Sequence, residues 1–241
     1  MSPGLLLGIV AAFALARLII TWRPALVPAQ AARATAREYL DAFIVAGLVA
    51  LLIVTFLGRP YFIPSASMEP TLQIHDVLLV DKLEYRFRQP AAGDIVVFPP
   101  PLASPDDFIK RVIGRPGDTL SIAGGVVKRN GIALHEPYIA QPPNYTLEIK
   151  NYGIVVDGTP LDPAIANIPP KSAWTAPDRI PPHCYFMMGD NRNDSEDSHA
   201  WGFAQDAGTF ATGERKGEAA GFTGRAVLLI WPFTRVRILH R

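Results

Sequence analysis

Two serines set between prolines are the first residues of this chain whose types and spacing could do chemistry. Ser65 and Ser67 lie in the stretch Ile63–Leu72, and Pro64 and Pro70 restrict the backbone around them. A rigid turn of this kind can present a hydroxyl at a fixed angle. Serine is a weak nucleophile at its own pKa, so it needs a nearby base and donors for a developing oxyanion. The alternative is a linker, since Pro and Ser are common in linkers.

A lysine on a predicted strand is the candidate for that base. The run Phe108–Ile113 has the β-branched, apolar character of a buried strand. Because side chains alternate along a strand, Lys110 shares a face with Phe108 and Val112. Ordinary lysine, with a pKa of about 10.4, is charged at neutral pH, whereas burial lowers that pKa. The alternative is a lysine that extends to water, and Arg111 on the opposite face is expected to be a solvated charge.

The loop Gly189–Gly202 is rich in acidic and amide side chains, which suggests either a solvated loop or a calcium site. An EF-hand-like reading puts Arg192 at a ligand position and has no glycine at the sixth position, which argues against calcium. The chain also has no His/Cys spacing pattern. We therefore expect no metal.

The composition excludes further classes. A net charge of +1 over 241 residues gives no large basic surface, so we expect no nucleic-acid partner. Cys184 is the only cysteine, so an intrachain disulfide is impossible. The residues from about Arg59 onward suffice for one domain with its own core, and the chain's 23 prolines argue against long helices there.

Short apolar runs separated by turn signals predict that this domain is a mainly β, antiparallel fold. An Asn-Gly pair between apolar runs, at Asn130, predicts a hairpin. Residues 121–182 are expected to form this hairpin and a Pro-rich irregular or small β insertion. The other predicted strands are Val77–Val80, Gly93–Phe98, Phe108–Ile113, Ala226–Ile230 and Val236–Leu239.

Two apolar runs precede the predicted domain, which covers 59–241. Residues 3–22 are apolar apart from Arg17 and long enough to span a bilayer, and 42–58 is a shorter uncharged run that predicts a second span. The connecting segment 23–41 carries three arginines, so the positive-inside rule predicts a cytoplasmic loop with both termini outside. The alternatives are a cleaved signal peptide for the first run, which lacks a positive n-region, and buried core helices for both.

Three motifs follow one another with Gly93-Asp94 between the first two. They are Ser65-Ala-Ser67-Met-Glu-Pro70-Thr71, Lys110-Arg-Val-Ile-Gly114 with Pro116-Gly117-Asp118, and Gly189-Asp-Asn-Arg192 through Asp197-Ser198. From roughly Tyr61 to Phe233 the chain closely resembles bacterial type I signal peptidases. The resemblance implies a membrane-bound serine endopeptidase with a Ser-Lys dyad, which cleaves N-terminal signal peptides from exported preproteins after small residues (Ala-X-Ala type). It also implies a multi-pass protein of the bacterial inner membrane with its catalytic domain on the periplasmic side.

The resemblance also implies roles for individual residues. Ser67 is expected to be the nucleophile and Lys110 the general base. Ser65 would donate to the oxyanion, Ser195 would orient the lysine amine, and Asp197 would support the site. The family usually has arginine where this chain has His199, so the usual salt bridge to Asp197 is in doubt. Asp190 and Arg192 are expected to be structural.

Small residues before the cut imply shallow substrate pockets. The resemblance makes Tyr61, Ile63, Met68, Leu72 and Ile109 the candidates to line them. We expect no cofactor, and as partners the signal peptides of preproteins and membrane lipid, with the enzyme a monomer. Two alternatives stay open: a specialised Ser-Lys processing peptidase of the pilin or conjugation type, and a membrane-anchored binding protein with a degenerate site.

Overall fold

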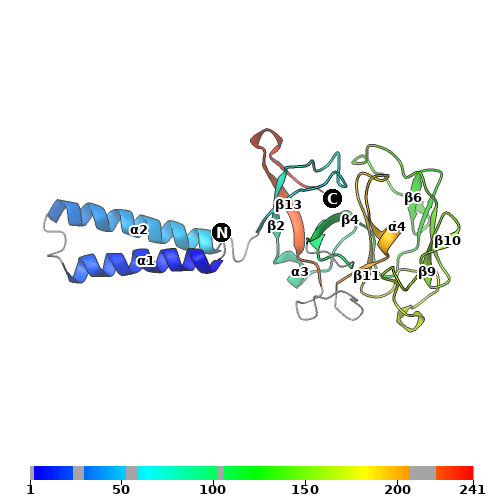
Figure 1. Ribbon diagram of the computed structural model, residues 1–241, viewed down its shortest axis with the longest axis horizontal. Helices are drawn as coiled ribbons and strands as arrows, with labels where there is room; N and C mark the ends of the chain where they lie inside the picture. The colour runs from blue at the N-terminus through cyan, green and yellow to red at the C-terminus, as the bar shows by residue number, and fades with distance from the viewer. Residues whose placement is uncertain (1–2, 24–29, 53–58, 102–105, 207–220, 241) are drawn as a thin grey trace. The chain divides into compact units, whose positions relative to one another are not determined.

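The structure is a computed structural model, and it describes residues 3–23, 30–52, 59–101, 106–206 and 221–240. The chain divides into two compact units, 1–59 and 60–241. The first unit is helical and the second is built from β-strands (Figure 1).

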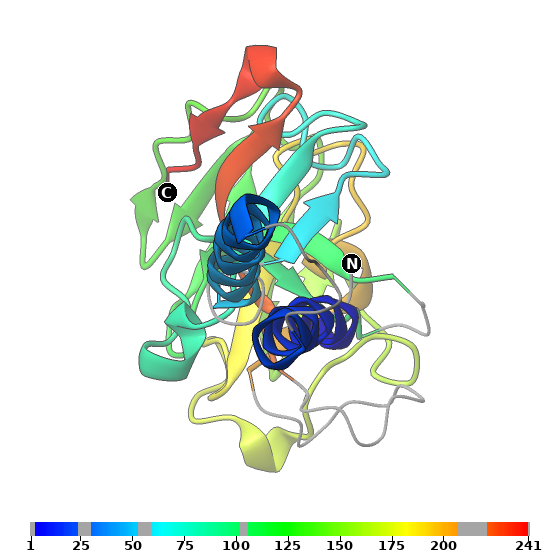
Figure 2. The same ribbon diagram turned by 90° about the vertical axis from the view of Figure 1, so that its left-hand side faces the viewer.

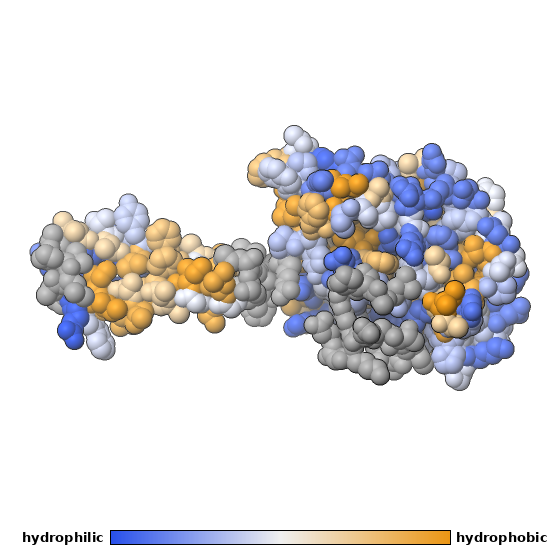
Figure 3. Space-filling model, viewed as in Figure 1, coloured by the Kyte–Doolittle hydropathy of each residue, from blue (hydrophilic) through white to orange (hydrophobic). Residues whose placement is uncertain are grey.

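The helical unit is a pair of helices that lie side by side, α1 (Pro3–Trp22) and α2 (Gln30–Leu52) (Figure 1). An added Cβ at Gly47 of α2 would come within 2.5 Å of the Val10 side chain, so this glycine permits close packing. Arg17 of α1 forms an ion pair of 2.9 Å with Asp41 of α2. On the face that Figure 3 shows, the outward side chains of the pair are mostly apolar.

Among the described residues, only α1, over Gly4–Trp22, is long and apolar enough to cross a membrane by length and composition. Of the predicted second span, residues 42–52 are helical in α2, and 53–58 lie outside the described residues. Helix α2 begins at Gln30, so residues 30–41 of the segment expected to be cytoplasmic are helical, and the location of this segment stays a prediction. Residues 30–41 include four alanines and two arginines, which are strong helix formers.

The β unit contains two sheets, and the larger one carries the predicted motifs. Its pairings from β2 to β12 are antiparallel, and the C-terminal strand β14 (Arg237–Ile238) lies on β13 (Figure 2). The order across this sheet is β1 (Arg59–Phe62), β2 (Val77–Asp81), β13 (Gly224–Trp231), β3 (Ile95–Phe98), β4 (Phe108–Gly114), β11 (Cys184–Met188) and β12 (Ala204–Gln205). The prediction of a mainly antiparallel β fold is confirmed, with each strand expected in this part present.

The smaller sheet contains the predicted hairpin, and it is also antiparallel. Asn130 and Gly131 both have positive φ, 54° and 78°, as a tight hairpin turn requires. The order across the smaller sheet is β10 (Thr159–Pro160), β9 (Gly153–Val156), β8 (Leu147–Lys150), β5 (Leu120–Ala123), β6 (Val126–Arg129) and β7 (Ile132–Ala133). Of the two forms expected for the Pro-rich insertion, irregular or small β, the structure has the β form, since β8, β9 and β10 join the sheet of the hairpin.

Strand β4 is buried on both faces, from Ile109 to Gly114. The expectation that Arg111 is solvated is therefore wrong: the residue is 2% exposed. It is retained in the interior because Asp190 receives two hydrogen bonds from its guanidinium, of 2.7 and 2.8 Å. The short helices are α3 (Glu84–Phe87), α4 (Ser198–Trp201), η3 (Lys171–Ala173) and η4 (Phe233–Arg235).

Candidate active site

Ser67 lies in a compact turn within the segment that joins β1 to β2. The Glu69 N–H donates to the Ala66 carbonyl and the Leu72 N–H to the Met68 carbonyl, at 3.0 and 2.9 Å. The side chains of Met68 and Leu72 are 1% and 0% exposed. These apolar anchors fix the turn to the core, while Ser67 itself stays half-buried. The hydroxyl is thus held at the edge of the core.

Lys110 reaches this hydroxyl from the middle of β4. Its Nζ donates a hydrogen bond of 2.7 Å to Ser67 Oγ, although the two residues are 43 apart in sequence. The residue is 5% exposed, and its amine also lies 5.6 Å from the centre of the Phe108 ring. The sequence-predicted pair is therefore brought into direct contact.

Burial is the main influence on the Lys110 amine, and it lowers the pKa of that group. The carboxylates of Asp197, Glu196 and Asp190 act in the opposite direction but do not outweigh it. A lowered pKa leaves more of the neutral amine at a given pH, and the neutral amine is the form that can accept a proton.

The two other serines of the predicted site lie close to the pair but make fewer contacts. Ser65 is exposed, and its Oγ lies 3.4 Å from Ser67 Oγ. Ser195 is buried, and its Oγ has no hydrogen-bond partner among the described residues. The expected bond from Ser195 to the Lys110 amine is thus not among the contacts found, and its role stays a prediction.

The loop after β11 approaches the nucleophile turn through its glycine. An added Cβ at Gly189 would stand 2.3 Å from the Ser67 carbonyl oxygen and 2.2 Å from Ser195 Oγ, distances that real Cβ atoms do not adopt. The Gly189 N–H donates to Asp197 Oδ2 at 2.9 Å. Glycine is therefore required here for the close approach of two backbones.

His199 occupies the position where the family usually has arginine, and it contacts Asp197 directly. Its Nδ1 lies 2.7 Å from Asp197 Oδ1, and its ring stacks on Tyr145 with 4.7 Å between the ring centres. Burial opposes protonation of His199, but the hydrogen bond and charge of Asp197 outweigh it, so the pKa of the imidazole is raised. Histidine thus makes the contact to Asp197 that the sequence placed in doubt, and this contact is an ion pair when the imidazole is protonated.

Asp190 and Arg192 serve the scaffold, as the resemblance implies. Arg111 pairs with Asp190, and Arg192 makes two hydrogen bonds to Glu136, of 2.6 and 2.8 Å. The Tyr138 ring lies 3.9 Å from the Arg111 guanidinium. Both arginines are fully or nearly fully buried, so each needs its carboxylate partner.

Sequence reasoning missed the contribution of the insertion to these pairs. Glu136, Tyr138 and Tyr145 all lie within residues 121–182, to which the sequence assigned no site residue, yet they contact Arg192, Arg111 and His199. No short motif marks these residues. The one available signal was that buried arginines and histidines require partners from elsewhere in the chain.

The five candidates for substrate pockets gather in one apolar cluster of the larger sheet. Four of them are buried in it, and Tyr61 packs against it while its hydroxyl donates to Asp107. The four buried members are Ile63, Met68, Leu72 and Ile109. Their common location is compatible with a pocket floor, and the binding role stays a prediction.

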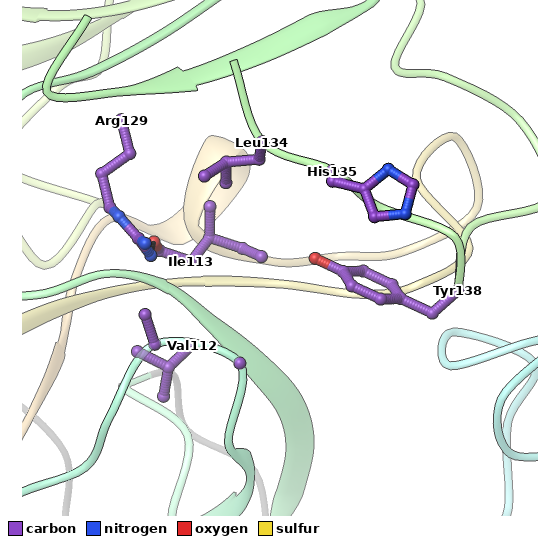
Figure 4. A pocket seen from close by; sticks show the side chains of 8 residues that line it. Val112, Ile113, Arg129, Leu134, His135 and Tyr138 are labelled. Carbon is purple, nitrogen blue, oxygen red and sulfur yellow. Dashed lines mark hydrogen bonds between the residues drawn. The ribbon is translucent and has the colours of Figure 1, made fainter. Parts of the chain in front are cut away.

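A separate cavity of about 160 Å³ lies beside β4 and is lined by none of the predicted catalytic residues. Figure 4 shows Tyr138 and Ile113 facing one another across it, with Arg129 and His135 at its sides. Its arginine is already engaged, because it donates to the Ile113 carbonyl at 3.0 Å. The cavity is thus distinct from the Ser67 site. No group of three or more metal-ligating side chains occurs within the part of the chain that the structure describes.

A serine hydroxyl that meets a buried lysine amine is the arrangement of a Ser-Lys hydrolase, one of the variants of the serine triad. Comparison with known proteins identifies the family. The family model described as "Signal peptidase, peptidase S26" matches residues 36–215. The chain belongs to this family, and it is therefore a peptidase.

Three relatives illustrate the similarity. A probable signal peptidase I-2 of Synechocystis sp. is 38% identical over 201 residues, covering 81% of this chain and 73% of the relative. Signal peptidase I of Leptolyngbya laminosa is 36% identical over 196 residues, 78% of this chain and 76% of the relative. Signal peptidase I of Pseudomonas aeruginosa is 34% identical over 183 residues, 68% of this chain and 62% of the relative.

Proposed function

We propose that this protein removes signal peptides from exported preproteins, with Ser67 as nucleophile and Lys110 as general base. The observation that carries the proposal is the 2.7 Å contact between Lys110 Nζ and Ser67 Oγ in a buried setting. The family to which the chain belongs supports the choice of substrate.

The chemistry is acyl transfer in two stages. Neutral Lys110 Nζ takes the hydroxyl proton while Ser67 Oγ attacks the scissile carbonyl carbon, and the carbonyl electron pair moves onto oxygen. When this intermediate collapses, the C–N bond breaks and the ammonium gives its proton to the leaving amine. Water then attacks the acyl ester, with Lys110 accepting its proton and returning it to Ser67 Oγ.

The remaining residues would stabilise and orient this pair. The Ser65 hydroxyl and the backbone N–H of Ser67 donate to the oxyanion. Ser195 orients the lysine amine, which would give its buried hydroxyl the partner that it otherwise lacks. Asp197, paired with His199, holds the backbone of the loop through the Gly189 N–H.

Cleavage after small residues follows from shallow pockets, for which the apolar cluster provides the side chains. A substrate in extended conformation can pair with the strands of the domain and present alternate side chains to such pockets. Tyr61 is partly buried and Ile109 is 9% exposed, whereas Met68 and Leu72 are 1% and 0% exposed.

The helical unit anchors the enzyme in the bacterial inner membrane. We propose that residues 3–22 and 42–58 form two spans, that 23–41 is cytoplasmic, and that 59–241 is the periplasmic peptidase domain. The apolar surface of α1 and the arginines of the connecting segment support this topology. The Arg17–Asp41 ion pair is compatible with it, since Arg17 lies toward the end of α1 that leads into the connecting segment and Asp41 directly precedes the proposed second span.

The direct test of function is incubation of the purified full-length protein in detergent with a panel of preproteins, followed by mapping of each cut by mass spectrometry. Cleavage of unrelated preproteins after an Ala-X-Ala type site is expected. Cleavage of a pilin-like substrate alone would replace the proposal by a specialised processing peptidase, and no cleavage at all would leave a binding protein.

The topology is tested by single cysteines at Ala32 and Thr159 in a Cys184→Ser background. An impermeant thiol reagent applied to intact spheroplasts is expected to label position 159 and not position 32. The opposite pattern would refute the topology without bearing on the chemistry.

A further inference from the structure

Asn191 holds the two carbonyl groups on either side of the Ser67 Cα. Its backbone N–H donates to the Ser67 carbonyl at 3.2 Å, and its side-chain Nδ2 donates to the Ala66 carbonyl, also at 3.2 Å. The side-chain bond joins residues that are 125 apart in sequence. Asn191 is half-buried and comes from the loop that begins at Gly189. Asn191 is thus hydrogen-bonded to the turn around Ser67 at two backbone carbonyl groups.

Because the peptide group is planar, the hydrogen bond to the Ala66 carbonyl also determines the direction of the Ser67 N–H. The Ala66–Ser67 peptide bond is trans, so the carbonyl of Ala66 and the N–H of Ser67 point in opposite directions within one plane. Fixing the carbonyl therefore fixes the direction of the Ser67 N–H. With the Ser67 carbonyl held as well, the planes on both sides of the Ser67 Cα are set, and these planes define its φ and ψ.

We infer that Asn191 is a positioning residue that aims the Ser67 N–H at the oxyanion formed during catalysis. The inference rests on the proposed function, in which that N–H is an oxyanion donor. An oxyanion donor is effective only when it is oriented before the charge develops. The Ala66 carbonyl also accepts a hydrogen bond of 3.0 Å from the Glu69 N–H within the turn. Asn191 therefore adds a second hydrogen bond to this carbonyl, from outside the turn.

A second asparagine of the same loop provides a matched control. Asn193 is exposed, its Nδ2 donates to the Pro142 carbonyl at 3.0 Å, and its Oδ1 accepts from the Asn144 N–H at 2.9 Å. These contacts tie the loop to the insertion and not to the nucleophile turn. Asn193→Ala removes two side-chain hydrogen bonds from the loop, so it reports the general cost of loosening this segment.

The first measurement is steady-state cleavage of a preprotein by the full-length protein in detergent. Asn191→Ala is expected to lower kcat by roughly tenfold to a hundredfold, because removal of an oxyanion donor itself costs about a hundredfold or more. KM should stay within about twofold of wild type, since the effect arises in the transition state. Asn193→Ala should leave both constants within about twofold.

The second measurement separates positioning from mere support of the fold. A peptide aldehyde adds to Ser67 Oγ: the new C–O bond replaces the carbonyl π bond, the serine proton moves to Lys110, and the aldehyde oxygen becomes an oxyanion-like hemiacetal. The corresponding peptide alcohol binds without this step. Asn191→Ala is expected to weaken inhibition by the aldehyde by about the factor lost in kcat and to leave the alcohol within about twofold.

Equal weakening of aldehyde and alcohol, or an unchanged kcat, would overturn the inference. Asn191→Asp keeps the shape of the side chain but turns acceptor oxygens toward the Ala66 carbonyl, so the same aldehyde-selective loss is expected. Loss of the fold in both variants, measured by circular dichroism, would assign Asn191 a structural role instead. If the wild-type protein cleaves no preprotein, the proposed function is wrong. If the wild-type protein cleaves preproteins and Asn191→Ala cleaves them equally well, only this inference is wrong.

Discussion

Replacement of Gly189 by alanine tests whether the loop after β11 must approach the nucleophile turn as closely as the structure has it. The added Cβ would lie 2.3 Å from the Ser67 carbonyl oxygen, and real Cβ contacts are essentially never shorter than 3.0 Å. The loop or the Ser67 backbone must therefore move by about 0.7 Å, the difference between these two distances. A shift of a flexible side chain cannot relieve the contact, because the obstructing oxygen belongs to the backbone.

A displacement of this size is large for a catalytic group. A misplacement of about 1 Å can cost roughly a hundredfold in rate, or about 2.7 kcal/mol of transition-state stabilisation. We expect kcat/KM of Gly189→Ala to fall by roughly thirtyfold to a hundredfold. The assay is cleavage of a preprotein by the full-length protein, with circular dichroism to establish that the variant is folded.

Gly153 in β9 is the matched control for this substitution. An added Cβ at Gly153 would have only one neighbour, the Lys150 carbonyl at 3.9 Å, which is ordinary van der Waals contact. The kcat/KM of the Gly153→Ala variant is expected to equal that of wild type. A folded Gly189→Ala protein with wild-type kcat/KM, or equal losses in both variants, would refute the reasoning.

Three further predictions concern the pair and its support. Ser67→Ala should abolish cleavage and retain the fold; turnover by a folded Ser67→Ala protein would remove the nucleophile assignment. Lys110→Arg should be as inactive as Lys110→Met, because arginine stays charged, and measurable turnover by the arginine variant would exclude a neutral base. His199→Gln should lose about 1.5 to 3 kcal/mol of stability near pH 5, as expected for a charge-assisted hydrogen bond, while His199→Arg should keep the ion pair with Asp197. Since the folded-state pKa of His199 is raised above its ordinary 6.5, this stabilisation is complete below that pH and disappears as pH rises through the folded-state pKa; a loss measured by urea unfolding that is equal near pH 5 and pH 9 would contradict it.

Local sequence signals predicted the strands well, and they also marked Ser67 and Lys110, which the structure brings into contact. The β-branched run around Lys110 specifies a buried strand by itself, and burial of its face follows from the apolar neighbours. The proline-restricted turn around Ser67 is likewise a local feature. Contact between the two was implied by the resemblance, and in the structure Lys110 on β4 reaches Ser67 in the segment after β1 through a hydrogen bond of 2.7 Å.

Long-range pairing is what the local pattern could not reveal. Arg111 alternates toward the face opposite Lys110, which reads as solvent-facing in an isolated strand. It is buried because Asp190, 79 residues away, supplies a bidentate partner. Tyr145 reaches His199 in the same way, through a fold-back of the insertion. Neither partner is adjacent in sequence, so no periodicity could have identified it.

The start of α2 shows that charge and hydropathy do not predict where a helix begins. Charge alone marked 23–41 as a connecting loop, because arginines are expected outside the bilayer. Helix propensity over Gln30–Asp41 is high all the same, and a helix can extend beyond the apolar segment that crosses a membrane. Membrane boundaries and helix boundaries are therefore separate quantities, and hydropathy predicts only the first.

The most direct test of a neutral Lys110 acting as the base for Ser67 is the pH dependence of kcat/KM for preprotein cleavage between about pH 5 and pH 10. Burial lowers the pKa of Lys110 below its ordinary 10.5, and only the neutral amine can accept the Ser67 proton. We expect log kcat/KM to rise with a slope of about one and to level off below the ordinary lysine pKa. A rate that is constant between about pH 6 and pH 9, or one that levels off near the ordinary histidine pKa of about 6.5 and is abolished by a histidine substitution, would contradict it.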